Sequence, residues 1–154
     1  MTQQFHLAQA NIAYMRAPME DPIMADFVAR IDALNKLADE APGFVWRLDS
    51  EEDEDACVAL FSGEDVLFNL SVWESIEALE TYVYRSNHIQ AVQKRAEWFE
   101  RPTRSPLVLW WIEAGHIPTQ QEAEQRFEML WQQGPTEQAF TFRKRFENRP
   151  RCPA

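Results

Sequence analysis

The pattern of apolar and polar positions predicts an ordered succession of strands and helices along this chain. In residues 5–14, FHLAQANIAY, side chains alternate with a period of two, so Gln9 and Asn11 share one face of a predicted strand. The run 107–112, LVLWWI, is continuously apolar and has the length of a buried strand. Further strands are expected at residues 44–48, 56–61 and 66–73.

Helices are predicted where apolar residues recur at helical spacing between capping and breaking residues. One begins at Asp21, which is followed by proline, and ends near Ala41. Another begins with the capping box of Thr119 and Glu122 and ends near Gln133. Between these two, we expect a helix over residues 74–84, a break at residues 85–87 and a second helix over residues 88–99.

The predicted order β-α-β-β-α-β is that of a ferredoxin-like α+β fold, an antiparallel sheet with helices on one face. We expect a single domain over residues 1–154, with its core at about residues 5–133 and a C-terminal extension at residues 134–154. The second face of the sheet is too apolar to stay exposed. Either the C-terminal segment covers it or a second copy of the chain does. We favour the second arrangement, a homodimer whose two sheets pair as a dimeric α/β barrel.

Composition and charge limit the classes of protein that fit. The net charge of −10 disfavours nucleic acid as a partner, because binding to phosphates requires clustered Lys and Arg. No apolar run approaches the ~20 residues of a membrane span, and the N-terminus lacks the apolar core of a signal peptide. We therefore expect a cytoplasmic protein without a membrane partner. Cys57 and Cys152 are expected to be free thiols, and no metal-ligand motif such as H-E-x-x-H is present.

The stretch 66–73, VLFNLSVW, predicts a strand with an unusual polar face. Asn69, Ser71 and Trp73 fall on one side, while Leu70 and Val72 fall on the other and are expected to pack against the helices. Buried polar groups are costly unless paired, so the polar side is expected to face a cavity that holds a ligand. The alternatives are that these side chains bond to one another across strands, or that they face solvent.

Candidate site residues follow from this interpretation. Polar groups would orient a ligand between aromatic walls, and the helix break would bring a cation and a histidine to the rim. A histidine at the start of a helix could act as a base, or it could be an ordinary capping residue. An arginine there could hold an anion, or it could form an ordinary ion pair. The candidates are Gln9, Asn11, Asn69 and Ser71 as polar groups, Trp46, Trp73 and Trp111 as walls, and Arg85 and His88 at the rim.

Several long stretches carry a resemblance to a known family. These are NLSVWESIEAL, YVYRSNH, LWWIEAGHIPT and GPTEQAFTFRKRF, and the resemblance extends over about residues 6–146. They resemble a bacterial domain-of-unknown-function family within the dimeric α/β-barrel superfamily. That superfamily includes antibiotic-biosynthesis monooxygenases and haem-degrading monooxygenases.

The resemblance implies a function and a set of catalytic residues. Asn11, Trp73 and His88 resemble the strand Asn, the Trp and the helix His of the haem-degrading branch, where the His ligates iron. Cofactor-free monooxygenases need only an Asn and a Trp to orient substrate and oxygen. The expectation is therefore a small-molecule-binding, monooxygenase-like protein that acts on an aromatic or polyketide-like substrate without a required cofactor. The alternatives are a haem protein that uses His88, and a non-catalytic dimeric sensor or interaction module.

Overall fold

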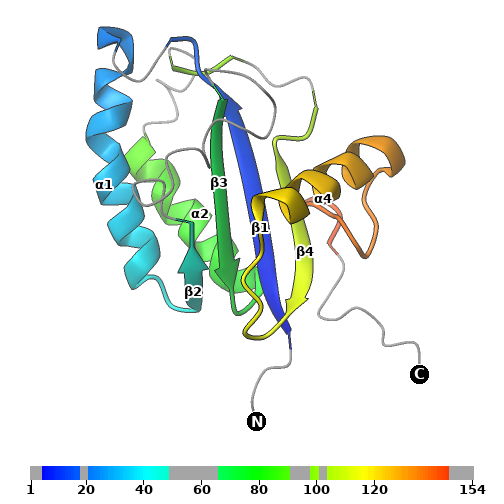
Figure 1. Ribbon diagram of the computed structural model, residues 1–154. Helices are drawn as coiled ribbons and strands as arrows, with labels where there is room; N and C mark the ends of the chain where they lie inside the picture. Colours follow the sequence, from blue (N-terminus) through cyan, green and yellow to red (C-terminus); the bar gives the residue numbers. More distant parts are fainter. Residues whose placement is uncertain (1–4, 18–20, 49–65, 91–97, 101–103, 146–154) are drawn as a thin grey trace, which may run out of the picture.

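The computed structural model describes residues 5–17, 21–48, 66–90, 98–100 and 104–145 (Figure 1). These residues form an α+β fold with a four-stranded antiparallel sheet and three α-helices, which confirms the expected class. The expected strand at residues 56–61 lies outside the described residues, as do Cys57 and Cys152. The strands are β1 (Phe5–Tyr14), β2 (Phe44–Arg47), β3 (Val66–Trp73) and β4 (Leu107–Glu113); the helices are η1 (Pro22–Met24), α1 (Ala25–Glu40), α2 (Ile76–Gln90) and α4 (Gln120–Gln133).

The strands lie in the order β2-β3-β1-β4, and each pair of neighbours is antiparallel. The long strands β1 and β3 occupy the centre of the sheet (Figure 1). Their register places Asn11 opposite Asn69 and Gln9 opposite Ser71. Because directly opposite residues point to the same face, this register brings the polar positions of the two strands together.

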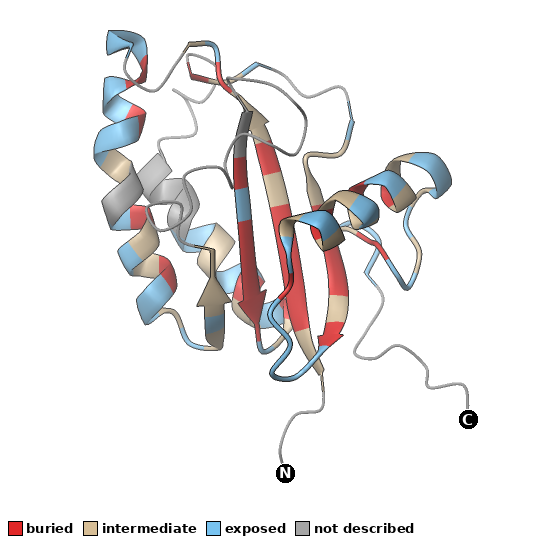
Figure 2. Cartoon of the chain, viewed as in Figure 1, coloured by how far each residue is buried: buried red, intermediate tan, exposed pale blue. Residues whose placement is uncertain are grey.

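Helices cover both faces of the sheet: the two helices expected on a common face, α1 and α2, share one, and the C-terminal helix α4 lies on the other. Figure 1 shows α1 and α2 on one side of the sheet and α4 on the other. Buried positions are concentrated on the central strands between these layers (Figure 2). On the first face, Leu7, Trp73 and Leu109 pack with Ala38 of α1 and Ile76 and Leu79 of α2. On the second face, the apolar cluster comprises Ala8, Ala10, Ile12, Leu70, Val72, Val108, Trp110 and Ile112 with Ala123, Phe127 and Leu130 of α4.

This arrangement corrects the predicted orientation of β3. Leu70 and Val72 pack beneath α4, and Ser71 and Trp73 face α1 and α2. The alternation of β3 was predicted, but both faces of the sheet are largely apolar. Polarity alone therefore could not indicate which helices lie on which side.

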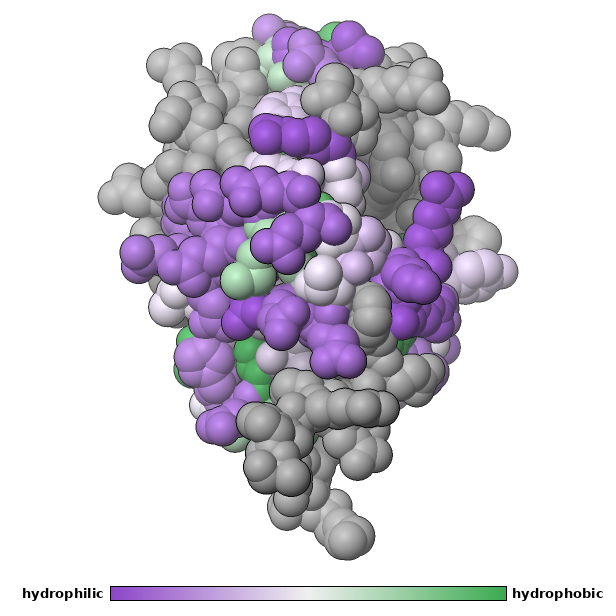
Figure 3. Space-filling model, turned by 90° about the vertical axis from the view of Figure 1, so that its right-hand side faces the viewer, coloured by the Kyte–Doolittle hydropathy of each residue, from purple (hydrophilic) through white to green (hydrophobic). Residues whose placement is uncertain are grey.

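The face that a second copy was expected to cover is occupied by the chain itself. Phe127 of α4 is completely buried against this face, and the outer side of α4 is polar. Figure 3, which views the molecule from the side of α4, shows a mainly hydrophilic surface. The structure thus takes the other arrangement foreseen from the sequence, with the C-terminal segment as the cover. The homodimer remains a prediction.

The predicted helix ends are confirmed at two caps and wrong at one break. The Asp21 carboxylate accepts the backbone N–H of Ile23 at 3.0 Å, and the Thr119 hydroxyl accepts that of Glu122 at 3.1 Å. By contrast, α2 continues through residues 85–87 to Gln90. Ser, Asn and His are only mildly unfavourable inside helices, so they do not by themselves end one. No helix in the described part of the chain is long and apolar enough to cross a membrane.

Candidate functional site

Five polar side chains on β1 and β3 form a continuous series of hydrogen bonds on the face beneath α1 and α2. Asn69 Nδ2 donates to Asn11 Oδ1 at 3.2 Å, and Asn11 Nδ2 donates to Gln9 Oε1 at 3.0 Å. Gln9 Nε2 donates to Ser71 Oγ at 2.8 Å, and Trp73 Nε1 donates to the same oxygen at 2.8 Å. We call these five residues the polar chain. It crosses between the two central strands twice, so it depends directly on their register.

The polar chain runs from the core to the surface. Trp73 is completely buried, and Gln9 and Ser71 are 5% and 8% exposed. Asn11 is half-buried and Asn69 is exposed. The side chains therefore bond to one another across strands at the buried end and meet solvent at the other. Both alternatives raised from the sequence occur, and a ligand-binding role for these residues remains a prediction.

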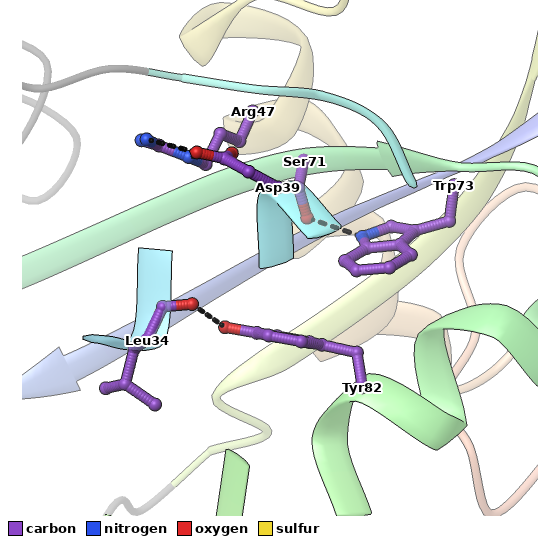
Figure 4. Close-up of polar contacts among 6 residues, drawn as sticks. All are labelled: Leu34, Asp39, Arg47, Ser71, Trp73 and Tyr82. Atoms are coloured by element: carbon purple, nitrogen blue, oxygen red, sulfur yellow. Dashed lines mark hydrogen bonds and ion pairs between the residues drawn. The ribbon is translucent and has the colours of Figure 1, made fainter. Parts of the chain in front are cut away.

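Aromatic rings from β2 and α2 enclose the buried end of the polar chain. Phe44 meets Trp73 edge to face, with ring centroids 5.4 Å apart. Tyr82 stacks on Trp73 with centroids 5.1 Å apart, and its hydroxyl donates a long hydrogen bond of 3.4 Å to the carbonyl of Leu34 on α1 (Figure 4). Burial raises the pKa of Tyr82, the Arg47 charge opposes this rise, and the Asp39 charge adds to it. The phenol is therefore protonated at neutral pH and can act as a hydrogen-bond donor.

An ion pair lies at the β2 edge of this site. Arg47 is directly opposite Ser71 in the register of β2 and β3, and its Nε lies 2.9 Å from Oδ1 of Asp39 on α1. Figure 4 shows Ser71 and Tyr82 beside the Trp73 ring, and the Arg47–Asp39 pair farther from it. The sequence reasoning did not select Tyr82, Arg47 or Asp39. The alternation of FVWR, which places Arg47 on the face opposite Trp46, was the one signal that could have identified Arg47.

The three tryptophans predicted as walls of the site do not all lie on the same face of the sheet. Trp46 is paired with Val72 and packs against the cluster beneath α4, so it does not share a chamber with Trp73. Trp111 is paired with Leu7 and packs on the same cluster as Trp73. The register shift of β2 between Phe44 and Trp46 places these two residues on opposite faces, although they are only two positions apart. Only Trp73 and Trp111 of the three predicted tryptophans therefore lie on the face of the polar chain.

The helix break that was expected to bring Arg85 and His88 to the rim of the site is not present. Because α2 is continuous through residues 85–87, no helix begins beside Arg85, whose side chain is exposed on α2. His88 lies within α2 rather than at the start of a helix, and its side chain lies outside the described residues. A role for His88 at the site therefore remains a prediction.

The geometry of the described residues does not fit haem. The ring of Trp73 is enclosed by Phe44 and Tyr82 and is completely buried, so it has no free face for a macrocycle. Asn11 is bonded to Gln9 and Asn69. In the described part of the chain, no three His, Cys, Asp or Glu side chains gather where they could hold a metal ion.

The site thus belongs to an α+β domain whose sheet is covered on both faces and carries a hydrogen-bonded polar chain beneath α1 and α2. A family described as Domain of unknown function (DUF3291) matches residues 6–152, and the chain belongs to that family. No curated protein matches the sequence.

Among solved structures, the chain is similar to SnoaB, a cofactor-independent oxygenase from Streptomyces nogalater. The identity is 10% and the TM-score is 0.41, over 74% of this chain and 96% of that chain. No conclusion about the activity of the present chain follows from a likeness at this level.

Proposed function

We propose that this protein binds a small aromatic or polyketide-like molecule on the sheet face beneath α1 and α2. The polar chain is the observation that carries this proposal, because it extends from buried Ser71 to exposed Asn69 beside aromatic rings. A few well-placed polar groups within an apolar surrounding are the usual composition of a small-molecule site. The exposed Asn69 and half-buried Asn11 would meet the ligand first.

We further propose that the chemistry is of the oxygenase type and that it requires no bound cofactor. An electron-rich aromatic anion can transfer electrons to oxygen directly, so the protein needs only to orient the reactants and exclude water. A hydroxylated anthrone such as dithranol is a suitable test substrate. Its methylene carbon would lose two hydrogens and gain one oxygen atom from O₂, while the second oxygen atom would leave as water and the product would be a quinone.

Binding and turnover of dithranol test the two parts of this proposal separately. Binding is measured as quenching of tryptophan fluorescence, and turnover as oxygen consumption above the rate in buffer. Asn11→Ala should weaken binding by about threefold to tenfold, the effect of one hydrogen bond. Gln125→Ala, an exposed change on α4, is the control and should have no effect.

The outcomes distinguish the functional alternatives. Binding without oxygen consumption would make the protein a sensor or binding module and would refute the oxygenase reaction. Failure of dithranol and related hydroxylated anthrones to quench the fluorescence would refute the site itself. Haem binding through His88 is the weaker alternative, because the enclosed Trp73 does not support it. If the Soret spectrum of haemin does not change when the protein is added, haem binding is refuted.

A homodimer is retained as part of the proposal on the resemblance alone. The apolar face that first suggested a partner is covered by α4, so any dimer would use a different surface. Sedimentation velocity at micromolar concentration tests this point directly. A single species with the mass of one chain would refute the dimer without affecting the proposed site.

A further inference from the structure

The hydrogen bonds of the polar chain all lead toward the Ser71 oxygen. Asn69 donates to Asn11, Asn11 donates to Gln9, and Gln9 donates to Ser71. Trp73 donates to Ser71 from the other side. The Ser71 oxygen therefore receives two N–H donors, and a hydroxyl oxygen has two lone pairs. Its own proton is left to donate, and no described residue accepts it.

This unused donor lies in a buried position where it would be costly to leave it unsatisfied. Ser71 is 8% exposed, and a buried donor without an acceptor destabilises a fold. Successive hydrogen bonds in a protein interior polarise one another, and here each of them increases the donor strength of the last hydroxyl. The arrangement thus prepares the Ser71 O–H group for an acceptor that is not a part of the described protein.

The polar groups around Ser71 are also mainly donors. Arg47 is paired with Ser71 in the register of β2 and β3, and the protonated Tyr82, whose ring stacks on Trp73, donates its hydroxyl to the Leu34 carbonyl. The Asp39 carboxylate is an acceptor, but Arg47 Nε and Nη2 both engage it, at 2.9 and 3.4 Å. A ligand oxygen would supply the acceptor that the Ser71 hydroxyl lacks among the described residues.

We propose that the Ser71 hydroxyl donates a hydrogen bond to an oxygen of the bound molecule, and that the ligands of this site are aromatic compounds bearing a carbonyl, phenolate or carboxylate oxygen. This inference rests on the proposed function and narrows its ligand class. Under this inference, Ser71 contacts the ligand. Gln9 and Trp73 are positioning residues, because they donate to the Ser71 oxygen and leave its proton directed toward the ligand.

Three naphthalenes that differ only at one ring carbon test the inference. Naphthoate carries a charged oxygen acceptor, acetylnaphthalene carries a neutral one, and ethylnaphthalene carries none. Calorimetric titration of the unaltered protein should show naphthoate binding about tenfold or more tighter than ethylnaphthalene, the ratio for one charge-assisted hydrogen bond. Acetylnaphthalene should lie between them, because a neutral acceptor forms a weaker bond.

Variants of Ser71 assign the preference to its hydroxyl. Ser71→Ala should reduce the naphthoate-to-ethylnaphthalene ratio to about one while leaving ethylnaphthalene affinity within about twofold. Ser71→Thr keeps a hydroxyl and should restore the ratio. Thr81→Ala removes an exposed hydroxyl of α2 and is the matched control, with the ratio unchanged. If circular dichroism shows that Ser71→Ala is unfolded, Gln9→Met should lower the ratio by interrupting the hydrogen bonds that lead to Ser71.

Three results would overturn the inference in distinguishable ways. Equal affinity of the unaltered protein for all three probes would refute the oxygen-acceptor class while leaving an aromatic-binding site in place. A preference for naphthoate that persists in Ser71→Ala would assign the acceptor contact to another residue. Failure of all three probes to bind would refute the proposed function together with this inference.

Discussion

The carboxylate of Glu122 accepts the indole N–H of Trp110, with 2.8 Å between Oε2 and Nε1. Its other oxygen lies 2.7 Å from Nε2 of His116, in the loop that leads into α4. Trp110 is completely buried in β4, and Glu122 lies in the first turn of α4. One carboxylate therefore attaches the helix that covers the second face of the sheet both to that sheet and to the connecting loop.

Glu122→Gln should remove a pH-dependent part of the stability. Burial acts to raise the pKa of Glu122, but the hydrogen bonds from His116 and Trp110 and the charges of His116 and Arg126 lower it below 4.5. A lowered pKa in the folded state adds stability above the ordinary pKa, and this stability is lost as the pH falls through the lower value. At neutral pH the variant should lose about 1–2 kcal/mol, with a smaller loss in acid.

Urea unfolding over a series of pH values measures this effect. Glu128→Gln changes an exposed carboxylate of the same helix, and its unfolding free energy should differ from that of the unaltered protein by less than about 0.5 kcal/mol. If the difference between Glu122→Gln and the unaltered protein were constant from neutral to acid pH, the carboxylate would not be the stabilising group.

The two ends of the polar chain should respond differently to substitution. Gln9→Leu should lower the free energy of unfolding by about 1–3 kcal/mol, because it leaves the Asn11 amide without its acceptor in a mostly buried site. Asn69→Leu removes a bond at the exposed end, where water can replace it, and should cost less than about 0.5 kcal/mol. Chemical denaturation of the two variants compares them. If both variants lost the same free energy of unfolding, the hydrogen bonds at Gln9 would be no better shielded from water than those at Asn69.

Local sequence signals predicted the elements of this fold well. Alternation marked β1 and β3, and the continuous apolar run marked β4. The Asp21 and Thr119 caps fixed two helix starts because a side-chain oxygen placed two or three residues before an unpaired N–H can satisfy it locally. Which β3 residues face which helices was predicted wrongly, because this depends on packing between distant segments and both faces of this sheet are apolar.

The candidate site was predicted only as far as local geometry reaches. Alternation placed Gln9 and Asn11 on one face of β1, and Asn69 and Ser71 on one face of β3. The register that joins them is set by pairing between strands about sixty residues apart, which no local pattern encodes. Tyr82 and Arg47 were not selected because they reach the site from other elements, α2 and β2. In the sequence, Tyr82 is one of the apolar residues of a helix, and Arg47 is an ordinary residue of a short strand.

Gly43→Ala should be strongly destabilising for two separate reasons. Gly43 has a φ of +84°, and a Cβ there would lie 2.5 Å from the Cβ of Ala78 on α2. Positive φ costs a residue with a side chain about 1–2 kcal/mol, and the collision adds to this. Gly115→Ala is the control, because Gly115 has a φ of +95° but nothing within 4 Å of its added Cβ.

Thermal and urea unfolding of both glycine variants separate the two causes. Gly43→Ala should cost more than Gly115→Ala, and adding Ala78→Gly should recover the collision part of the loss. If the two single variants lost the same stability, the close approach of α2 to Gly43 would not constrain the fold.

The C-terminal segment after α4 should prove to be part of the core. Phe140 is completely buried with Leu7, Trp73 and Leu109, and it exchanges two backbone hydrogen bonds with Leu109 of β4, at 2.8 and 2.9 Å. Removing a buried aromatic ring leaves a cavity, so Phe140→Ala should lower the free energy of unfolding by about 3–5 kcal/mol. Phe142 packs on the same cluster but is only half-buried, so Phe142→Ala should cost clearly less.

Urea unfolding followed by circular dichroism compares these two variants within one segment. Because Phe140 packs with Trp73, its loss should also shift the tryptophan fluorescence, whereas a change confined to the surface would leave the spectrum unaltered. Equal, small losses for both variants would show that the segment lies on the surface and contributes little to the face beneath α2. A large loss for Phe140→Ala alone would show that the chain closes the β4 edge of the site with its own C-terminal segment.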